Sequence, residues 1–351
     1  MINEWSSNVR AHRRYELLSV GFLVLFILFG GIVFTIAIVY LLIFGNTYAQ
    51  VLCVSYLVFF YIDFDTPSNG GRGIGCEWVR NWRIWKYVID YFPVDLVKTV
   101  DLPSNRHYLI GCCPHGILCF GALTNGMTNH SKWRNLFPNI RSKVLTLSIN
   151  MLFPIFRELI LSWGCSDSSA ENINTLLSQS HDPSDAINKD GFTSNAAIVM
   201  FGGAREAFLS APNSYKIFIN TRKGFVRLAI QNGAALVPAI AFGETSVYDT
   251  TQNENGSAVR KIQEIIKKYT TLAPVLFNGR GLFQQNFGLI PRRHPITLVI
   301  GEPIDCIKNA TPSNDEIDEL HALFRKRLIE LFETNKSKYI ENHDKVHLEI
   351  A

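Results

Sequence analysis

The 351-residue sequence lacks cysteines paired in a way that would hold a metal ion or build a disulfide framework. Its cysteines are odd in number and none has the CxxC spacing, so we expect free thiols in a reduced compartment and no metal site. The seven are Cys53, Cys76, Cys112, Cys113, Cys119, Cys165 and Cys306.

The signatures of nucleotide cofactors and of nucleic-acid binding are also missing. Gly202-Gly203 has neither the Walker nor the GxGxxG spacing, which argues against a bound nucleotide cofactor. The net charge is only +4 and the basic residues form no recognition helix, so no nucleic acid is expected as a partner. A mild positive charge suits a membrane surface or an anionic substrate.

Formal charge is absent from Leu17–Phe44, a run of about 28 residues that exceeds the roughly 20 needed to cross a bilayer core. A second apolar run, Tyr48–Ile62, follows the polar break Gly45-Asn46-Thr47, so the sequence predicts a transmembrane helical hairpin over 17–62. The second run, of about 15 residues, is short enough to be re-entrant instead. A signal peptide is disfavoured, because the first run is too long and no small-residue cleavage site follows it.

Basic residues flank the predicted hairpin on both sides, whereas its connecting turn has none. The positive-inside bias therefore places both ends of the hairpin, and with them both chain termini, in the cytosol. The flanking residues are Arg10, Arg13 and Arg14 before the hairpin and Arg72, Arg80, Arg83 and Lys86 after it.

Composition divides the rest of the chain into a cytosolic segment 1–16, a connection 63–100 and an α/β domain 101–351. The connection mixes aromatic and basic side chains, as is typical of a segment at the level of the lipid headgroups. An aromatic-rich core helix would have the same composition.

Beyond residue 100, apolar runs of strand length alternate with helical patterns, which predicts a largely parallel sheet flanked by helices. The expected strands cover 108–113, 196–201, 216–220, 236–242 and 296–300. The expected helices cover 117–127, 224–232 and 259–269, and a last one begins near Pro312 with Thr311 as its cap.

One imidazole lies between an expected strand and an expected helix, in the run YLIGCCPHGILCFG (108–121). Pro114 keeps Cys113 extended and so ends the strand, and Gly116 permits close approach of the backbone. His115 is therefore our first candidate for a general base, with a packed or surface histidine as the alternative. The amides at the start of the following helix, near Gly116, are candidates for an oxyanion site.

Further candidates follow a Gly-Gly turn and several later turns. Glu206, in VMFGGAREAF, is a candidate for orienting His115 and stabilising its imidazolium, although a solvated helix-start glutamate is the simpler interpretation. Cys112 and Cys113 would suit a cysteine-dependent thioesterase, but their apolar neighbours favour inert thiols. Candidates for binding the phosphates of a nucleotide-like substrate, with solvated surface charge as the alternative, are Arg222, Lys223, Arg280 and Arg292.

Together these segments resemble the diacylglycerol acyltransferase 2 family, which includes monoacylglycerol and wax-alcohol acyltransferases. The similarity runs from the hairpin to the C-terminus, and the order and spacing of its markers make it specific. The markers are FLVL (22–25), FDTPSNGGR (64–72), WVRNWRIWKYVIDYFPVDLVKT (78–99), PHG (114–116), FGGAREA (201–207), RKGFVRLAIQNGAALVP (222–238), FGETSVY (242–248) and GRGLFQQNFGLIPRRHPITLVIGEPI (279–304).

The resemblance implies acyl transfer from acyl-CoA to the hydroxyl of diacylglycerol, at the endoplasmic reticulum membrane and on lipid droplets, by a glycerolipid-acyltransferase-like α/β domain. Monoacylglycerol or long-chain alcohol acyltransferases and a catalytically decayed neutral-lipid-binding protein are the alternatives. The resemblance further implies that His115 is the catalytic base with Glu206 as its partner, and that Phe22 and Leu25 contact neutral lipid. Expected partners are acyl-CoA, the acceptor and membrane lipids, with a homo-oligomer left open, and no metal or other cofactor is expected.

Two positions depart from the patterns of these enzymes. The family reads HPHG where this chain has Cys113 before Pro114-His115-Gly116, which leaves rate or substrate choice open. At the HxxxxD spacing of the wider acyltransferases this chain has Phe120, as is usual in this family, so Glu206 is the only acid that a motif supports.

Overall fold

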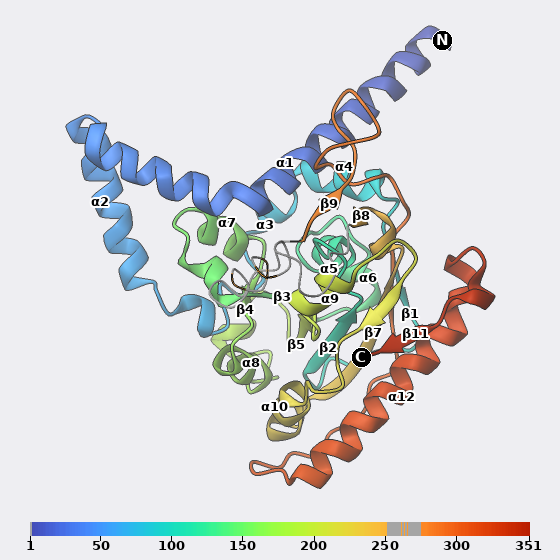
Figure 1. The fold of residues 1–351 in the computed structure, drawn as a ribbon. Coiled ribbons are helices and arrows are strands. Elements are labelled where there is room, and N and C mark those ends of the chain that lie inside the picture. The colour runs from blue at the N-terminus through green and yellow to red at the C-terminus, as the bar shows by residue number, and fades with distance from the viewer. Residues whose placement is uncertain (1, 251–260, 262, 264, 266–274) are drawn as a thin grey trace.

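A seven-stranded sheet with the strand order β1-β10-β7-β2-β5-β3-β4 forms the centre of the computed structural model, which describes residues 2–250, 261, 263, 265 and 275–351 (Figure 1). Neighbouring strands are parallel except β10 and β7, which run antiparallel. The predicted largely parallel sheet is thus confirmed. Its strands are β1 Asp95–Lys98, β2 Tyr108–Cys113, β3 Ile140–Thr146, β4 Ser166–Asp167, β5 Ser194–Val199, β7 Ala235–Phe242 and β10 Thr297–Ile300.

Two pairs of short strands lie outside this sheet. One pair is parallel and joins the C-terminus to the middle of the chain, and the other is antiparallel. They are β6 Tyr215–Ile217 with β11 Leu348–Ile350, and β8 Asp249–Thr250 with β9 Phe277–Asn278.

Helices cover both faces of the sheet, because alternate side chains of each strand point to opposite faces. In β2, Tyr108, Ile110 and Cys112 join one apolar cluster, whereas Leu109 and Cys113 join another. The first cluster includes α3 Glu77–Arg80, α4 Arg83–Tyr91, α5 Phe120–Gly126, α6 Trp133–Leu136 and α7 Phe156–Ser162. The second includes α8 Ala170–Leu177, α10 Gly224–Asn232 and α12 Asn314–Tyr339. Shorter helical segments are α9 Ala204–Leu209, η1 Thr66–Ser68, η2 Ser148–Leu152, η3 Ala186–Asn188, η4 Glu244–Ser246 and η5 His343–Lys345.

Two helix starts differ from the sequence predictions. The helix expected from residue 117 begins at Phe120, because the preceding residues form a turn in which Cys119 has φ 54°. The last helix is capped by Ser313 instead of Thr311, since Ser313 and Glu316 bond reciprocally to each other's backbone amides. The helix expected over 259–269 lies largely outside the described residues.

Two long N-terminal helices form the predicted hairpin. α1 covers Ile2–Phe44 and α2 covers Thr47–Ile62, and Asn46 caps α2 by accepting a hydrogen bond from the Ala49 amide at 2.9 Å. The helical segments Ala11–Phe44 and Thr47–Ser68, the second of which extends beyond α2, are long and apolar enough to cross a membrane by length and composition. The end of α1 and most of α2 project from the sheet domain (Figure 1).

The middle of α1 packs on the domain, whereas the N-terminal end of the helix projects from it (Figure 1). Val20, Leu23 and Val24 are buried in the cluster that also contains α4. Further on, a Cβ added to Gly31 would lie 2.7 Å from the Phe153 ring, so glycine is needed for this close approach. α1 also changes direction along its length in Figure 1, and the Gly30-Gly31 pair gives a physical cause for such a bend.

The aromatic connection 63–100 is mostly part of the core. Trp85 and Tyr91 of α4 are buried beneath α1, so the expectation that this stretch lies at the headgroup level is wrong for α4. The aromatic-rich core helix is the correct alternative there. Trp78 differs, with 73% of its surface exposed.

Candidate active site

His115 lies in the turn that follows β2, a strand between β5 and β7 in the middle of the sheet. Its Nδ1 is 3.2 Å from the carbonyl oxygen of Gly116. Because a carbonyl oxygen only accepts, Nδ1 carries the hydrogen and Nε2 keeps its lone pair. Burial lowers the pKa of His115, so the ring is neutral near pH 7 and its Nε2 is able to accept a proton.

Glu206 reaches this turn from α9, but it binds the main chain and not the ring. Its Oε2 accepts the backbone N–H of His115 at 3.0 Å, and its Oε1 accepts that of Phe218 at 3.0 Å. Burial raises the pKa of Glu206 to about 7, although both hydrogen bonds favour the charged form. The expected pairing of Glu206 with the imidazole is therefore not the contact that the structure shows, and the carboxylate fixes the position of the turn.

The Gly-Gly turn before α9 makes room for this carboxylate. A Cβ added to Gly202 would fall 1.9 Å from Oε1 of Glu206. Gly203 has φ +54°, a conformation that glycine adopts most easily. The FGGAREA motif therefore combines a buried acid with the two small residues that let it fold back against the strand ends.

A second buried carboxylate, Glu244, lies on the other side of the turn. It follows β7, and its Oε1 and Oε2 accept the backbone N–H groups of Phe120 at 2.8 Å and Gly121 at 2.7 Å. Burial raises its pKa to about 7. These two amides begin α5, and both already donate to Glu244. The expectation that amides at the start of this helix form an oxyanion site is therefore wrong for Phe120 and Gly121.

Gly116 fits closely between His115 and Glu244. Its φ is +59°, and an added Cβ would lie 2.7 Å from Cγ of Glu244. Within the described part of the chain its amide makes no hydrogen bond. The turn thus presents one neutral imidazole and one free N–H, and two buried carboxylates hold it in place.

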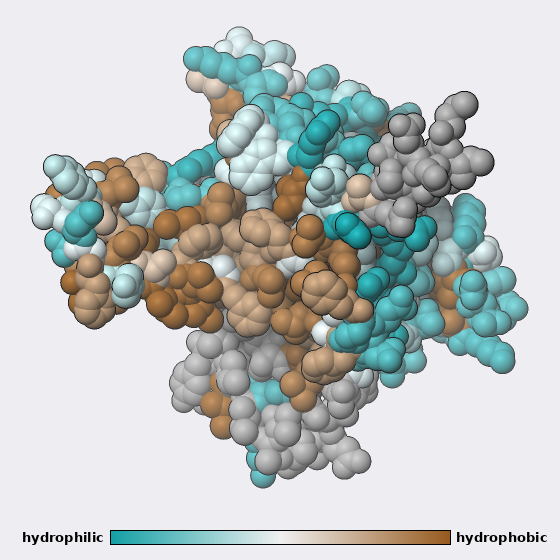
Figure 2. Space-filling view, turned by 90° about the horizontal axis from the view of Figure 1, so that it is seen from above, coloured by the Kyte–Doolittle hydropathy of each residue, from teal (hydrophilic) through white to brown (hydrophobic). Residues whose placement is uncertain are grey.

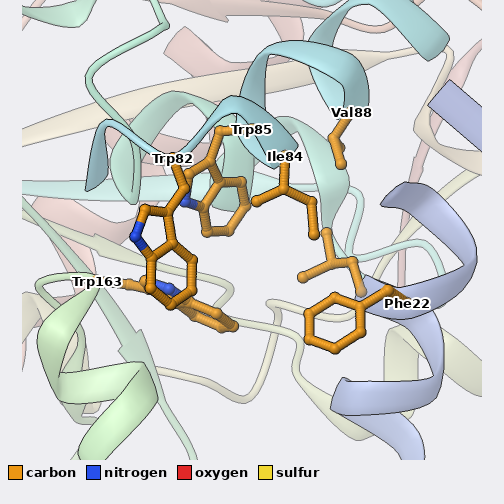
Figure 3. Close-up of a pocket in the computed structure, with 7 residues that line it drawn as sticks. Phe22, Trp82, Ile84, Trp85, Val88 and Trp163 are labelled. Atoms are coloured by element: carbon orange, nitrogen blue, oxygen red, sulfur yellow. The ribbon is translucent and has the colours of Figure 1, made fainter. Parts of the chain in front are cut away.

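An apolar pocket lies between α1, α4 and the end of α7 (Figure 3). Phe22 points into it from α1, and indole rings of Trp82, Trp85 and Trp163 face it from the opposite side. Leu25, the other candidate for contact with neutral lipid, is half-exposed on α1 and is not among the lining residues. The full lining is Phe22, Leu23, Trp82, Ile84, Trp85, Val88 and Trp163.

Comparison with known families decides the assignment. A family model described as diacylglycerol acyltransferase matches residues 41–351. The chain belongs to the diacylglycerol acyltransferase family. It is accordingly an acyltransferase, and its two apolar helices make it a membrane-anchored one.

Relatives in this family align along almost the whole chain. The 2-acylglycerol O-acyltransferase 1 of Bos taurus is 39% identical, covering 95% of this chain and 94% of the relative. The diacylglycerol O-acyltransferase 2 of Bos taurus and that of Homo sapiens are each 37% identical over 95% of this chain, and the alignments cover 89% and 82% of those proteins. A solved lysophosphatidate acyltransferase, PlsC from Thermotoga maritima, covers 80% of this chain and 95% of its own at 11% identity, with a TM-score of 0.34 that is too low to support comparison.

The basic candidates of this acyltransferase lie in two places instead of one patch. Arg222 and Lys223 precede α10. The positive charge of Arg222 partly opposes the increase that burial causes in the pKa of Glu206. Lys223 forms an ion pair with Asp318 at 2.5 Å. Arg292 forms an ion pair with Asp249 beyond β7. Arg280 precedes the loop 281–289 and Arg292 follows it, and the backbone of Arg280 pairs with that of Ile290.

The surroundings of the cysteines next to His115 disfavour a nucleophilic role for them in this acyltransferase. Cys112 and Cys113 are buried, and burial raises the pKa of both thiols well above the ordinary value. The Cys113 thiol donates to the carbonyl of Ala239 at 3.6 Å, inside the cluster on the α12 side of the sheet. This environment disfavours a cysteine-dependent thioesterase.

Sequence reasoning missed Glu244, although a signal was present. A glutamate follows directly after a long apolar strand in FGETSVY, and such a position is at the carboxyl end of a strand in the same sheet as His115. Its partner amides lie more than 120 residues earlier, so no local pattern links them.

Proposed function

We propose that this acyltransferase moves a fatty acyl group from acyl-CoA to the hydroxyl of diacylglycerol and so makes triacylglycerol. The diacylglycerol O-acyltransferase 2 relatives, aligned over 95% of the chain, support this choice of acceptor. The single observation that carries the chemistry is the neutral His115 ring, whose Nε2 lone pair is free because Nδ1 donates to Gly116.

In the proposed reaction, Nε2 of His115 takes the proton of the acceptor hydroxyl as the hydroxyl oxygen attacks the thioester carbonyl. The Gly116 amide stabilises the resulting oxyanion. The carbon–sulfur bond then breaks, and the imidazolium returns its proton to the departing thiolate, which leaves as CoA. Glu206 is a positioning residue in this scheme, and the reaction requires no metal or redox cofactor.

We assign the lipid and CoA parts of the substrates to different regions. The apolar pocket between α1 and α4 suits a hydrocarbon chain, and Phe22 and Leu25 are candidates for contact with it. Arg222 and Lys223, near Glu206, are the better candidates for the CoA phosphates, with Arg280 and Arg292 as the second pair.

Monoacylglycerol is the second candidate acceptor. The relative from Bos taurus named 2-acylglycerol O-acyltransferase 1 is 39% identical, compared with 37% for the diacylglycerol O-acyltransferase 2 of the same species. Both acceptors present a hydroxyl on an apolar body, so the proposed chemistry is the same for either.

We further propose that the membrane is that of the endoplasmic reticulum, with lipid droplets as a second location and both termini in the cytosol. The excess of basic residues on both flanks of the hairpin, and their absence from its turn, support this orientation.

The test presents labelled acyl-CoA to membranes containing the full-length chain with diacylglycerol, monoacylglycerol or a long-chain alcohol in turn. We expect triacylglycerol from the first reaction, and a loss of about 10²–10⁴-fold in His115→Ala, the usual contribution of a general base. Cys113→Ala, a neighbouring buried position outside the site, is the control and should keep its activity. Full activity of His115→Ala would refute the assigned base, and product from monoacylglycerol alone would favour the second acceptor.

A further inference from the structure

A stripe of half-exposed, large apolar side chains runs along α1 beside the face that packs on α4, so that Tyr15 stacks on Tyr87 of α4 and Phe22 lines the pocket shared with α4. Its members are three or four residues apart, as one face of a helix requires. Their exposed fractions lie between 44% and 56%. The stripe consists of Tyr15, Leu18, Phe22, Leu25, Phe29 and Ile32.

The loop 281–289 is attached beside this stripe. Arg280 and Ile290 close its base, since the Ile290 amide donates to the Arg280 carbonyl at 3.0 Å and the Arg280 amide donates back at 2.6 Å. Cδ1 of Ile290 lies 3.5 Å from the Cβ position of Gly21, which is on the same turn of α1 as Phe22. Figure 1 shows this orange segment next to α1.

Two further contacts hold the end of this loop against α1 and α4. Arg293 forms an ion pair with the buried Glu16 of α1, and its guanidinium lies over the ring of Tyr91. The Tyr91 hydroxyl donates to the Pro291 carbonyl at 2.6 Å. The position of the loop beside the stripe is therefore fixed at its base.

The tip of the loop carries aromatic side chains that the described chain leaves uncovered. Phe283 is 101% exposed and Phe287 is 74% exposed, and Leu282 and Leu289 are also exposed. Figure 2, which views the molecule from above Figure 1, shows apolar side chains gathered across the middle of this side of the molecule, with polar side chains along the border. Large apolar patches with a polar rim mark contacts with membranes or partners.

We propose that the stripe on α1 and the loop 281–289 form a second membrane-contacting face, which seats the catalytic end of the sheet on the bilayer that the hairpin enters. A bilayer is the occupant that fits, because the stripe continues along α1 into the hairpin of this membrane-anchored chain. Exposed Arg13 and Arg14 lie beside the start of the stripe, where anionic headgroups would meet them.

This face lies at the same end of the sheet as His115. The loop leads into β10, whose first residue, Thr297, pairs with Phe242, the last residue of β7. β7 is parallel to β2, so both strands end on the side where the His115 turn begins. A lipid dissolved in the bilayer would approach the chain from this side, and the inference does not depend on which lipid is acylated.

Spin labels on the full-length chain in phosphatidylcholine–phosphatidylserine vesicles test the proposal. Cysteines are introduced one at a time by Phe283→Cys, Leu18→Cys and Ile307→Cys, in a Cys76→Ser background that removes the exposed native thiol. Ile307 is the matched control, because it is 90% exposed but lies at the opposite end of the sheet. There, the neighbouring Ile304 pairs with Leu236 near the start of β7.

We expect the labels at positions 283 and 18 to collide with oxygen, which dissolves in the bilayer, and to lose most collisions with a water-soluble nickel chelate. The label at position 307 should show the reverse. A label at position 283 as accessible to the nickel chelate as the one at position 307 would overturn the proposal. A second copy of the chain is the competing occupant, and coupling between labels at position 283 that disappears on dilution with unlabelled protein, without lipid contact, would assign the face to a dimer instead.

The unmodified chain provides an independent measurement. A photoactivatable phospholipid in the same vesicles should form crosslinks that mass spectrometry maps to peptides covering 281–289. Crosslinks confined to the part of the hairpin beyond Ile32 would contradict the proposal, even if every cysteine variant had failed to fold.

Discussion

The turn around His115 is held by carboxylates that lie under it and not beside its ring. Glu206 binds the amide of His115, and Glu244 binds the first two amides of α5. A single imidazole in a solvent-facing loop would sample several rotamers and turn geometries, whereas this one starts from a main chain that is fixed on both sides. The arrangement explains why the motif needs glycine on both of its arms, at Gly116 and at Gly202.

Gly116→Ala should reduce both stability and acyl transfer. Alanine at positive φ costs about 1–2 kcal/mol, and the contact with Glu244 adds the cost of overpacking, typically about 1–3 kcal/mol. Gly191→Ala is the matched control, since Gly191 also has positive φ but no atom within 4 Å of the added Cβ. Thermal unfolding of the solubilised chain should show the larger shift for Gly116→Ala, and equal shifts would argue against the close packing with Glu244.

The two buried carboxylates predict an unusual dependence of stability on pH. Burial raises the pKa of Glu206 and of Glu244 to about 7, from 4.5 for an ordinary glutamate. A carboxyl whose pKa is raised on folding binds its proton more tightly in the folded state. The contribution of these two carboxyls to the free energy of unfolding should therefore be fully present below pH 4.5 and decrease as the pH rises toward 7, by at most about 1.4 kcal/mol per pH unit for each group.

Unfolding of Glu244→Gln, measured across this pH range, should show a shallower decrease than the wild type. Glu316→Gln is the control with the opposite sign, because hydrogen bonds at the α12 cap lower the pKa of Glu316. Its carboxylate stabilises the folded chain at higher pH, and that contribution is lost as the pH falls. An unchanged slope in Glu244→Gln would show that this carboxyl has an ordinary pKa.

At the scale of residues, sequence patterns located the parts of the site but not their contacts. His115 and Glu206 are in motifs whose turns are readable from proline and glycine, and the structure brings the two residues together. The acceptor of each hydrogen bond was not predictable, because it depends on how strands 90 to 120 residues apart end beside one another. Glu244 was missed for that reason.

At the scale of elements, the alternation of apolar runs gave β2 and α10 with the correct bounds, whereas helix starts were less accurate. The error at α12 arose from choosing Thr311 next to Pro312, although Ser313 and Glu316 have the spacing of a capping box. The error at α5 has another origin. Its start depends on Glu244, a tertiary contact that compensates for the unfavourable φ of Cys119.

Ser313→Ala should lower the free energy of unfolding by about 1 kcal/mol, since an N-cap side chain is lost. Thr311→Ala lies two residues away and should have little effect, because its side chain does not cap the helix. The two variants are compared by thermal unfolding under the same conditions. A larger effect of Thr311→Ala than of Ser313→Ala would support Thr311 as the capping residue, as predicted from the sequence.

The contact between α1 and the Phe153 ring can be tested with a second pair of glycines. Alanine in place of a helical glycine gains about 1 kcal/mol in propensity. At Gly21 the new Cβ meets Ile290 at 3.5 Å, an ordinary contact, so Gly21→Ala should be neutral or stabilising. At Gly31 it meets Phe153 at 2.7 Å, so overpacking of about 1–3 kcal/mol should outweigh the gain and Gly31→Ala should destabilise the chain.

At the scale of the whole molecule, the predicted hairpin and α/β domain are present, but the division between them is less sharp than composition suggested. The first half of the apolar run in α1 is part of the domain's own core, and α4 of the aromatic connection packs beneath it. Hydropathy reports that a segment avoids water, and it does not report whether protein or lipid replaces the water.

The length of α2 permits a direct test of whether the hairpin crosses the bilayer. Its 16 residues span about 24 Å, somewhat less than a hydrocarbon core of about 30 Å. In the proposed topology the turn between α1 and α2 reaches the lumen, so we expect a glycosylation acceptor, inserted with flexible spacers between Gly45 and Asn46, to be modified in microsomes. The same acceptor added after Ala351 should stay unmodified, and an unmodified turn would show a re-entrant hairpin.

The pairing of β1 with β10 has a consequence for how the protein is made. β1 leaves the ribosome soon after the membrane helices, but its neighbour in the sheet is synthesised about 200 residues later. At about 5–20 residues per second, the new chain waits about 10–40 s with this strand unpaired. During that interval the anchor is already in the membrane while an open sheet edge is exposed to aggregation, so nascent chains of this protein should depend on chaperones until β10 has emerged.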